Sequence, residues 1–508
     1  MTVHLPILPI LIPMLGGLLM LLPPFAGAKR YLHRRVAALV LMLAQLACSI
    51  ILMQMVVENG AIMYAVGDWQ PPYGIILYAD KLSVMLVALG SLLGLGITLY
   101  SFGGSDREGK YFHPLVQFQL LGIYGAFLTN DLFNLFVFFE VLLIASYTLL
   151  IHGGGKHKTA ANVHYVILNL IGSSLFLFAL GTLYGVTGTL NIADMALRIP
   201  ELSQSQALIA QAGGSLMLIV FGLKSAMLPL HFWLPQTYAA ASAPVAALFA
   251  IMTKVGVYCI FRVYTVVFGE QAGELADMIV PWVWPLAIAT VVFGTIGALA
   301  SPNLRTLAGN LVIVSVGTLL IAFALRTPEA SAAAFLYLIH STLVTAALFL
   351  IADMIAQQRG RAIDYFVVAR KIKQQALLGV LFIVVAMAAA GLPPFSGFLG
   401  KLVILQSATD SDHRIWVWSV ILIPSLFTII ALSRAGTTLF WRNTPSHDAA
   451  ESAGVSRWQI GGAVLLLMAS PTLALFGAHV IEYTNAAAAQ LHDIQYLLEV
   501  MNLDGDSK

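Results

Sequence analysis

The sequence predicts an all-α polytopic membrane protein with about fourteen transmembrane helices. Its 508 residues are 59% hydrophobic and only 10% charged, with a mean hydropathy of +0.88. A water-soluble domain carries about 25% charged residues, so this composition excludes a water-soluble fold. Apolar stretches of about 17–25 residues, long enough to cross a bilayer, recur along the whole chain. The alternating pattern of a membrane β-barrel is absent, which leaves a bundle of helices that satisfy their own backbone hydrogen bonds.

The apolar segments follow one another without a linker long enough to separate two domains. The first segment lacks the basic start of a signal peptide and contains three prolines, so we expect a retained first helix. After the last segment, a mildly amphipathic tail is expected to form a helix on the surface of the complex or the membrane. The expected helices lie near residues 5–25, 36–57, 79–102, 112–129, 131–151, 162–187, 208–234, 243–267, 279–299, 305–325, 331–356, 376–408, 415–440 and 459–481.

Prolines interrupt the seventh and the twelfth of these segments, at Pro229 and at Pro393-Pro394. Transporters built from two inverted halves place broken helices at corresponding positions, with their binding site near the bilayer midplane. The two breaks therefore suggest an internal repeat, although the sequences around them share little. Lys224 lies just before the first break and Lys401 just after the second.

Basic residues gather in alternate loops, which predicts the orientation of the chain. Membrane proteins keep an excess of Lys and Arg in their short cytoplasmic loops. The loops after helices 1, 3, 5, 9, 11 and 13 are therefore expected to be cytoplasmic, and both termini to lie on the outer, periplasmic side. These loops hold seventeen of the 26 Lys and Arg residues: Lys29, Arg30, Arg34, Arg35, Arg107, Lys110, Lys156, Lys158, Arg305, Arg359, Arg361, Arg370, Lys371, Lys373, Arg434, Arg442 and Arg457.

Four charged residues lie deep inside apolar spans: Glu140, Lys224, Lys254 and Lys401. A charge at the centre of a bilayer costs at least about 2.5–3.5 kcal/mol, and such residues mark ion or proton pathways. Buried charges of both signs in one chain therefore indicate translocation of ions or protons. The alternatives are a structural ion pair for Glu140 and side chains that reach the interface for Lys224 and Lys401.

Lys254 and two histidines suggest how protons could pass between these charges. Lys254 lies about eleven residues into its helix, too central to reach an interface, and fits the middle of a proton wire. His340 is the only ionisable group in the middle of its helix, and histidine titrates near neutrality, which suits a relay. His231 follows Lys224 by seven residues and is a secondary candidate. Both histidines retain the alternative of hydrogen-bonded core residues.

The remaining charged and sulfur-bearing residues predict no further site. Four charged residues fall at helix ends, where the membrane interface explains them: Asp80, Lys81, Asp131 and Asp353. Cys48 and Cys259 both lie inside expected helices, which excludes a disulfide framework and a cysteine-based metal site. We expect no metal and no cofactor, because no nicotinamide, flavin, haem or iron–sulfur pattern is present.

Three segments resemble the antiporter-like membrane subunits shared by respiratory complex I and the Mrp multisubunit cation/proton antiporters. The segments are KSAMLPLHFWLPQTYAAASAPVAAL from Lys224, the stretch around Glu140 that ends in Ser146-Tyr147, and GLPPFSGF before Lys401. The likeness covers nearly the whole chain. It implies two inverted five-helix repeats and a hydrophilic axis along the membrane midplane. The resemblance divides the chain into residues 1–111 for helices 1–3, 112–267 for the first repeat, 268–440 for the second, and 441–508 for helix 14 and the tail.

The resemblance also implies a role for each buried group. Glu140 and Lys224 would form a modulating pair, Lys254 and His340 a relay, and Lys401 the group that opens to one side. Tyr238, where complex I subunits usually carry histidine, and Lys401 make the chain look most like the D-type subunits of the Mrp antiporters. A proton-pumping membrane subunit of a complex I-like NADH:quinone oxidoreductase, or of a membrane-bound hydrogenase, is the alternative.

A D-type subunit would be part of a secondary transporter and not an enzyme. The resemblance then implies exchange of Na⁺ or K⁺ for H⁺ in a bacterial cell membrane. The expected partners are a large A-type subunit, small hydrophobic subunits and membrane lipid. Under the alternative, the chain would belong to a translocating NADH dehydrogenase.

Overall fold

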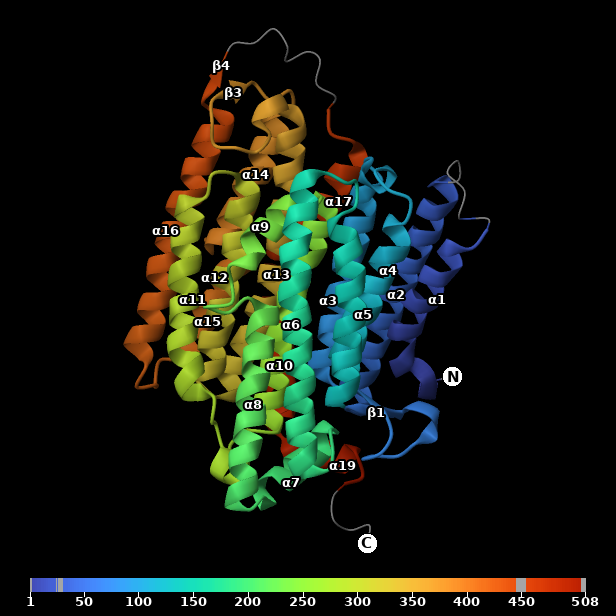
Figure 1. Cartoon of the computed structure of the whole chain (residues 1–508). Helices are drawn as coiled ribbons and strands as arrows, with labels where there is room; N and C mark the ends of the chain where they lie inside the picture. Colours follow the sequence, from blue (N-terminus) through green and yellow to red (C-terminus); the bar gives the residue numbers. More distant parts are fainter. Residues whose placement is uncertain (1, 24, 26–30, 445–453, 504–508) are drawn as a thin grey trace.

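The computed structural model describes residues 2–23, 25, 31–444 and 454–503, and in this part the chain is almost entirely helical (Figure 1). The α-helices are α1 Leu8–Leu21, α2 Tyr31–Asn59, α3 Lys81–Ser101, α4 Phe112–Leu128, α5 Leu132–Leu150, α6 Lys156–Thr187, α7 Ile192–Arg198, α8 Gln204–Ser225, α9 Trp233–Ala240, α10 Ala243–Val266, α11 Val280–Ala300, α12 Leu304–Ala324, α13 Pro328–Gln358, α14 Gln375–Ala390, α15 Ser396–Ser407, α16 Arg414–Phe440, α17 Arg457–Leu475, α18 Gly477–His492 and α19 Ile494–Val500. Short 3-10 helices cover Thr2–Ile7, Val66–Asp68, Ser105–Arg107, Ile199–Glu201, Gly273–Leu275 and Gly360–Ala362.

Two small sheets mark the two ends of the bundle. Strand β1 (Ile62–Ala65) pairs antiparallel with β2 (Ile76–Ala79), and lies at the lower end of Figure 1 with α7 and α19. Strand β3 (Ala369–Arg370) pairs parallel with β4 (Asn443–Thr444) at the upper end. The described part of the basic loops lies at the upper end, which we call the basic face. Lys29 and Arg30 lie outside the described residues. The lower end is called the opposite face.

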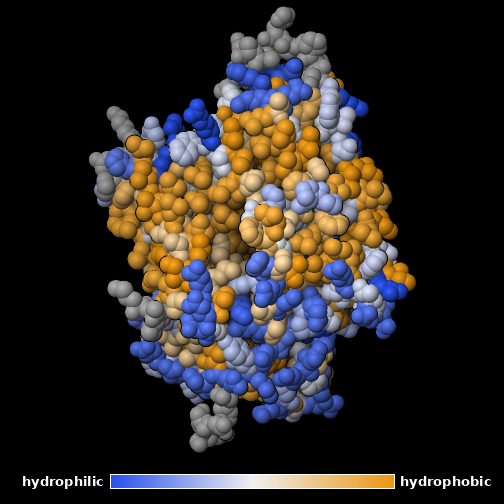
Figure 2. All heavy atoms as spheres, turned by 180° about the vertical axis from the view of Figure 1, so that it is seen from behind, coloured by the Kyte–Doolittle hydropathy of each residue, from blue (hydrophilic) through white to orange (hydrophobic). Residues whose placement is uncertain are grey.

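Twelve of the helices in the described residues are long and apolar enough to cross a membrane, by length and composition. Two expected spans are outside this set: α4 has 17 residues, and the segment near 376–408 is divided into α14 and α15. The total of fourteen spans therefore stays a prediction. Seen from behind, hydrophobic residues form a broad band, and hydrophilic residues gather at both ends (Figure 2).

The core of the bundle consists of α10, α12 and α13. The most apolar 18-residue windows of α10 and α12 are 100% buried, and that of α13 is 94% buried, whereas α2, α6 and α16 expose much of their apolar surface. A helix that is apolar on all sides belongs in the interior, so these sequences match their places. The polar residues carried by the three core helices are thereby shielded from lipid.

Both proline-interrupted segments are broken in the structure. Helix α8 ends at Ser225, Ala226 adopts the left-handed conformation (φ 60°), and α9 begins only at Trp233. Helix α14 ends at Ala390, and the left-handed Gly391 (φ 83°) precedes α15. In Figure 1, α8 and α15 lie in the lower half of the bundle and α9 and α14 in the upper half. Each break therefore leaves helix ends inside the bundle.

The C-terminal tail begins with helix α18 (Gly477–His492), which packs by one face against the bundle. Helix α18 follows α17 after a one-residue break at Phe476 and packs against α13 and α3. Ala487 and Ala488 are buried in this contact, because small side chains let the helices approach closely. His492, the last residue of α18, hydrogen-bonds Ser331 of α13 across 3.0 Å. The first part of the tail is thus a helix on the surface of the bundle, with one face packed on α13 and α3 and with Ala478, His479 and Glu482 exposed.

Candidate functional site

Glu140 lies on α5 and is held by the neighbouring helix α6. The hydroxyl of Ser173, on α6, donates a hydrogen bond to Oε1 of Glu140. Ser173 is buried and Glu140 is half-buried. The carboxylate is therefore shielded from lipid on its α6 side and has a polar partner there.

Lys224 lies in the last turn of α8 and is 6% exposed. Its ammonium group donates to Oδ1 of Asn169 on α6 across 3.0 Å and lies 5.8 Å from the ring centroid of Phe139. The carbonyl end of a helix carries a partial negative charge, so the end of α8 is a favourable place for an ammonium group. The interpretation of Lys224 as an interfacial side chain is wrong, because the residue is enclosed.

The described residues contain no direct ion pair between Glu140 and Lys224. Instead, Ser173 binds Glu140 and Asn169 binds Lys224, and the two residues are one turn apart on α6. The charges of Glu140 and Lys224 still act on each other electrostatically. Helix α6 is thus the bridge between them. Sequence analysis missed this bridge, although a polar i, i+4 pair inside an apolar span was its visible signal.

Lys254 is completely buried in the middle of α10. Its ammonium group donates to the hydroxyl of Ser315 on α12 across 2.7 Å. Two residues further, Gly256 faces α8 so closely that a Cβ there would lie 2.7 Å from the nitrogen of Ser225 and 3.0 Å from the carbonyl carbon of Lys224. Backbone contact between α10 and the end of α8 therefore brings the helices of the two lysines together.

His340 lies in the middle of α13 and is also buried. Its Nδ1 is 2.8 Å from the hydroxyl of Ser396 on α15, which is 2.9 Å from the hydroxyl of Ser470 on α17. A Cβ on Gly397 would lie 2.7 Å from Nε2, so only glycine allows the ring this position. The charges of Lys401 and Lys254 both act on His340. His340 therefore lies within electrostatic reach of both lysines.

Lys401 lies on α15, just after the second break. Its ammonium group donates to the carbonyl of Ala390 across 2.9 Å and to the hydroxyl of Ser425 on α16 across 2.8 Å. Ala390 is the last residue of α14, so this lysine binds the carbonyl end of a half-helix. Lys401 is half-buried, in contrast to Lys224 and Lys254.

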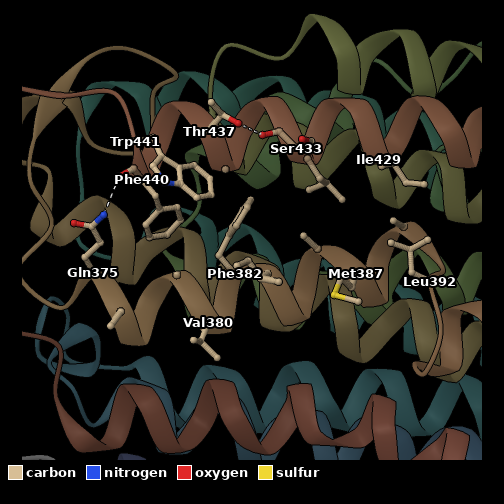
Figure 3. Close-up of a pocket in the computed structure, with 17 residues that line it drawn as sticks. Gln375, Val380, Phe382, Met387, Leu392, Ile429, Ser433, Thr437, Phe440 and Trp441 are labelled. Atoms are coloured by element: carbon tan, nitrogen blue, oxygen red, sulfur yellow. Dashed lines mark hydrogen bonds between the residues drawn. The ribbon is translucent and has the colours of Figure 1, made fainter.

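A groove of about 610 Å³ between α14 and α16 leads toward Lys401. Figure 3 shows Gln375 and Trp441 at one end of the groove and Leu392 at the other. The amide of Gln375 donates to the carbonyl of Phe440 across 2.9 Å. Ala390, the acceptor of Lys401, belongs to the lining. The groove therefore connects the basic face with the second break.

His231 is separate from this row. It lies in the irregular segment between α8 and α9, and its ring packs against Phe293 of α11 at 6.3 Å between centroids. The structure thus links Glu140 with Lys224 through α6, brings the helices of Lys224 and Lys254 together at Gly256, and places His340 within electrostatic reach of Lys254 and Lys401. His231 is apart from these groups.

Two charged residues that sequence analysis attributed to the interface are engaged in ion pairs. Asp80 is 1% exposed and its Oδ2 lies 2.6 Å from Nη2 of Arg262. Asp353 binds Arg305 at 2.7 Å and accepts a hydrogen bond from Tyr100 at 2.8 Å. Asp80 is the N-cap of α3, at a helix end as expected, but its buried pairing with Arg262 goes beyond that expectation. Asp131 is the N-cap of α5, as a helix-end residue should be.

The described residues contain no group of three or more His, Cys, Asp or Glu side chains that could hold a metal ion. The site is instead a row of single ionisable groups, each held by neutral oxygen or hydroxyl partners from another helix. Such a row can pass protons from one group to the next.

A family model described as "NADH:quinone oxidoreductase/Mrp antiporter, TM" matches residues 129–428. This range contains all five groups of the row. The chain belongs to this family.

Relatives from the antiporter branch of the family match almost the full length. The D-type Na⁺/H⁺ antiporter subunit of Bacillus subtilis (strain 168) is 36% identical, over 97% of this chain and 98% of the relative. The probable D-type K⁺/H⁺ antiporter subunit of Rhizobium meliloti (strain 1021) is also 36% identical, over 96% and 95%. A chain in the solved structure of the Mrp complex from Dietzia sp. DQ12-45-1b has a TM-score of 0.85 and 26% identity, over 98% and 99%. The match extends beyond the family model to both ends of the chain.

Proposed function

We propose that the chain is the D-type, proton-translocating subunit of a multisubunit antiporter that exchanges a monovalent cation, Na⁺ or K⁺, for H⁺. Relatives that match nearly its full length are named as D-type subunits of such antiporters. The observation that carries the proposal is the row of buried ionisable groups that begins at Glu140 and ends at Lys401. A subunit of this kind is a transporter and not an enzyme.

The proton path runs through four groups in order. Lys224 takes up a proton, Lys254 and His340 relay it through water, and Lys401 releases it. Asn169 and Ser315 hold the first two ammonium groups, and Ser396 orients the imidazole of His340. Each partner is neutral, so a lysine that has lost its proton leaves no unpaired buried anion behind.

Glu140 controls the first step of this path. Its negative charge stabilises the ammonium form of Lys224, and α6 carries the partners of both groups. A movement of α6 against α5 and α8 changes both contacts together. The approach of a cation or a neighbouring subunit to Glu140 would weaken its hold on Lys224 and release the proton along the row.

The complex and its location complete the proposal. The partners are a large A-type subunit, small hydrophobic subunits and lipid of a bacterial inner membrane, and both termini lie on the outer side. A redox-driven pump subunit is the competing function within the same family. Its complex would purify with iron–sulfur subunits, whereas the antiporter would purify with hydrophobic subunits alone.

Neutralisation of the first pair tests the proposal. Glu140→Gln and Lys224→Met should each abolish cation-dependent proton movement in inside-out vesicles, while the amount of assembled complex stays normal. The exposed residues Glu201 and Lys156 supply matched controls, Glu201→Gln and Lys156→Met, which should leave exchange unchanged. Normal exchange in either Glu140→Gln or Lys224→Met would overturn the proposal.

A further inference from the structure

A ladder of polar side chains descends along α10 from Lys254 toward the opposite face. Tyr258 and Arg262 follow Lys254 at intervals of four residues, so all three lie on one side of the helix. Nε of Arg262 donates to the hydroxyl of Tyr258 across 3.2 Å, and this hydroxyl donates to the carbonyl of Phe127 across 2.8 Å. The proposed proton path from Lys224 to Lys401 does not include Tyr258 or Arg262.

The ladder ends in the buried ion pair between Arg262 and Asp80. The side chains of these residues are 5% and 1% exposed, and the two charged atoms are 2.6 Å apart. Asp80 caps the N-terminus of α3, and its Oδ1 accepts a hydrogen bond from the backbone of Ser83. Apolar packing replaces a buried pair without loss of stability in many proteins, so a stabilising role alone explains this pair poorly.

Polar atoms without a protein partner surround the pair. In the part of the chain that the structure describes, the hydroxyls of Tyr78 and Thr265 are buried and have no hydrogen-bond partner. The ring of Tyr78 lies 5.7 Å from the guanidinium of Arg262, and Thr265 follows Arg262 by three residues on α10. Nearly all buried polar groups in proteins are hydrogen-bonded, and water serves where no protein atom does. The cluster is therefore suited to hold water.

The C-terminal helix α18 covers this cluster at the opposite face. The hydroxyl of Tyr483 donates to the carbonyl of Lys81 across 2.8 Å, and Oε1 of Gln490 accepts from the backbone nitrogen of Lys81 across 2.9 Å. Both contacts fix the residue directly after Asp80. The end of α3 that carries Asp80 is thus held in place by α18.

We propose that this cluster is a second, hydrated outlet for protons, which runs from Lys254 to the opposite face and is closed by the Asp80–Arg262 ion pair. The inference rests on the proposed function, because it takes Lys254 as a proton carrier. Tyr258 positions water between Lys254 and Arg262. When the pair opens, this water becomes continuous with the water outside, and the proton leaves along it.

Thiol labelling tests the outlet without any transport measurement. Thr265→Cys is introduced into the complete complex after Cys48 and Cys259, both buried, are replaced by serine. A cationic, membrane-impermeant thiol reagent is added from the opposite face. If the open state is at most about 10% populated, Asp80→Asn should speed the labelling about tenfold. Equal rates with and without Asp80→Asn, or no labelling in either, would overturn the inference.

A second ion pair on the same face supplies the matched control. Nε of Arg198 lies 3.0 Å from Oδ2 of Asp194, and both residues belong to α7. Arg198→Gln should leave the labelling of Thr265→Cys unchanged. An equal acceleration by Arg198→Gln would mean general loosening of this face, and would count against a gate at Asp80.

Proton flux separates the outlet from a purely structural pair. Asp80→Asn should raise the proton leak of vesicles in the absence of Na⁺ and K⁺, whereas a structural pair predicts less assembled complex and no leak per complex.

Tyr258→Phe keeps the ion pair, so it should reduce coupled exchange without a leak and without faster labelling. Unchanged exchange in Tyr258→Phe would contradict the outlet even if Asp80→Asn failed to assemble. If Lys224→Met and Glu140→Gln left exchange intact while Asp80→Asn still sped labelling, the proposed function would fail and the gate would stand.

Discussion

At the scale of single residues, the three lysines of the row share one feature: their hydrogen-bond partners are neutral. Lys224 binds an amide oxygen, Lys254 a hydroxyl, and Lys401 a hydroxyl and a carbonyl. A carboxylate partner would be left as an unpaired buried charge whenever the lysine lost its proton, at a cost of several kcal/mol. Neutral partners avoid this cost. The partners are therefore as informative about proton transfer as the lysines themselves.

Removal of the amide partner of Lys224 should damage transport. Hydrogen bonds to charged groups contribute about 1.5–3 kcal/mol, so Asn169→Ala is expected to lower the exchange rate by about tenfold or more. The rate is measured as the cation-dependent collapse of a pH gradient in vesicles. Asn162, two turns earlier on α6, provides the control Asn162→Ala, which should keep the parental rate. Equal rates in the two variants would show that Asn169 has no part in the path.

At the scale of elements, the row depends on helices that approach each other at the level of the backbone. Gly256 of α10 has no room for a Cβ, because the nitrogen of Ser225 and the carbonyl carbon of Lys224 occupy that space. Likewise, a Cβ on Gly397 of α15 would clash with the ring of His340. These glycines set the spacing of the helices, and the spacing sets the distances between the ionisable groups of the row.

Addition of one methyl group at Gly256 should therefore displace the end of α8. Gly256→Ala is expected to reduce exchange strongly, with a smaller loss of assembled complex, since the clash is with backbone and not with a flexible side chain. Exchange per assembled complex is the measurement. A Cβ on Gly181 of α6 would meet no atom within 4 Å, so Gly181→Ala is the control and should have no effect. Normal exchange in Gly256→Ala would contradict the importance of this contact.

The contact between α18 and α13 should be sensitive to acid. Burial, with the charge of Arg326 nearby, lowers the pKa of His492 to about 4. Between pH 6.5 and about 4, the unfolded chain binds more protons than the folded one, so stability falls as the pH falls through this window. His492→Gln cannot titrate and should lose less stability on acidification. Thermal unfolding of the purified complex at about pH 7 and about pH 5 measures the difference.

An exposed histidine serves as the control for this measurement. His157, near the start of α6, is exposed, so His157→Gln should keep the acid sensitivity of the parent. If His492→Gln showed the same decrease in melting temperature as the parent, the acid sensitivity would have another origin.

At the scale of the whole molecule, the basic loops gather on one face, and this predicts the orientation in the membrane. Lys156 on the basic face and Glu201 on the opposite face are both exposed, and the two native cysteines are buried. In intact cells, Glu201→Cys should react with an impermeant thiol reagent and Lys156→Cys should not. Inside-out vesicles should give the reverse result. The opposite pattern would invert the expected topology.

The sequence was sufficient for those features that belong to a single segment. The spans near α3, α10 and α13 follow from hydropathy, the breaks from Pro229 and Pro393-Pro394, and the buried charges from their position within a span. Each of these can be read from local composition alone.

Features that depend on how helices face each other could not be predicted. The roles of Asn169 and Ser173 as partners of Lys224 and Glu140 depend on the packing of α6 against α5 and α8. The ion pair of Asp80 with Arg262 could not be predicted because the two residues are far apart in the sequence. The packing of α18 on α13 likewise depends on two segments that only the folded chain brings together.

The two half-helices that end inside the bundle give the molecule a built-in asymmetry. The carbonyl end of α14 is a fixed electrical bias at Lys401, which no change of pH or of neighbouring charge can switch off. At Lys224, two groups favour the ammonium form: the carbonyl end of α8 and the carboxylate of Glu140. The effect of Glu140 changes with its distance from Lys224 and with bound cations. The electrostatic environment of Lys224 is thus adjustable, whereas that of Lys401 is constant. Under the proposed function, control over the direction of proton flow therefore resides at Lys224.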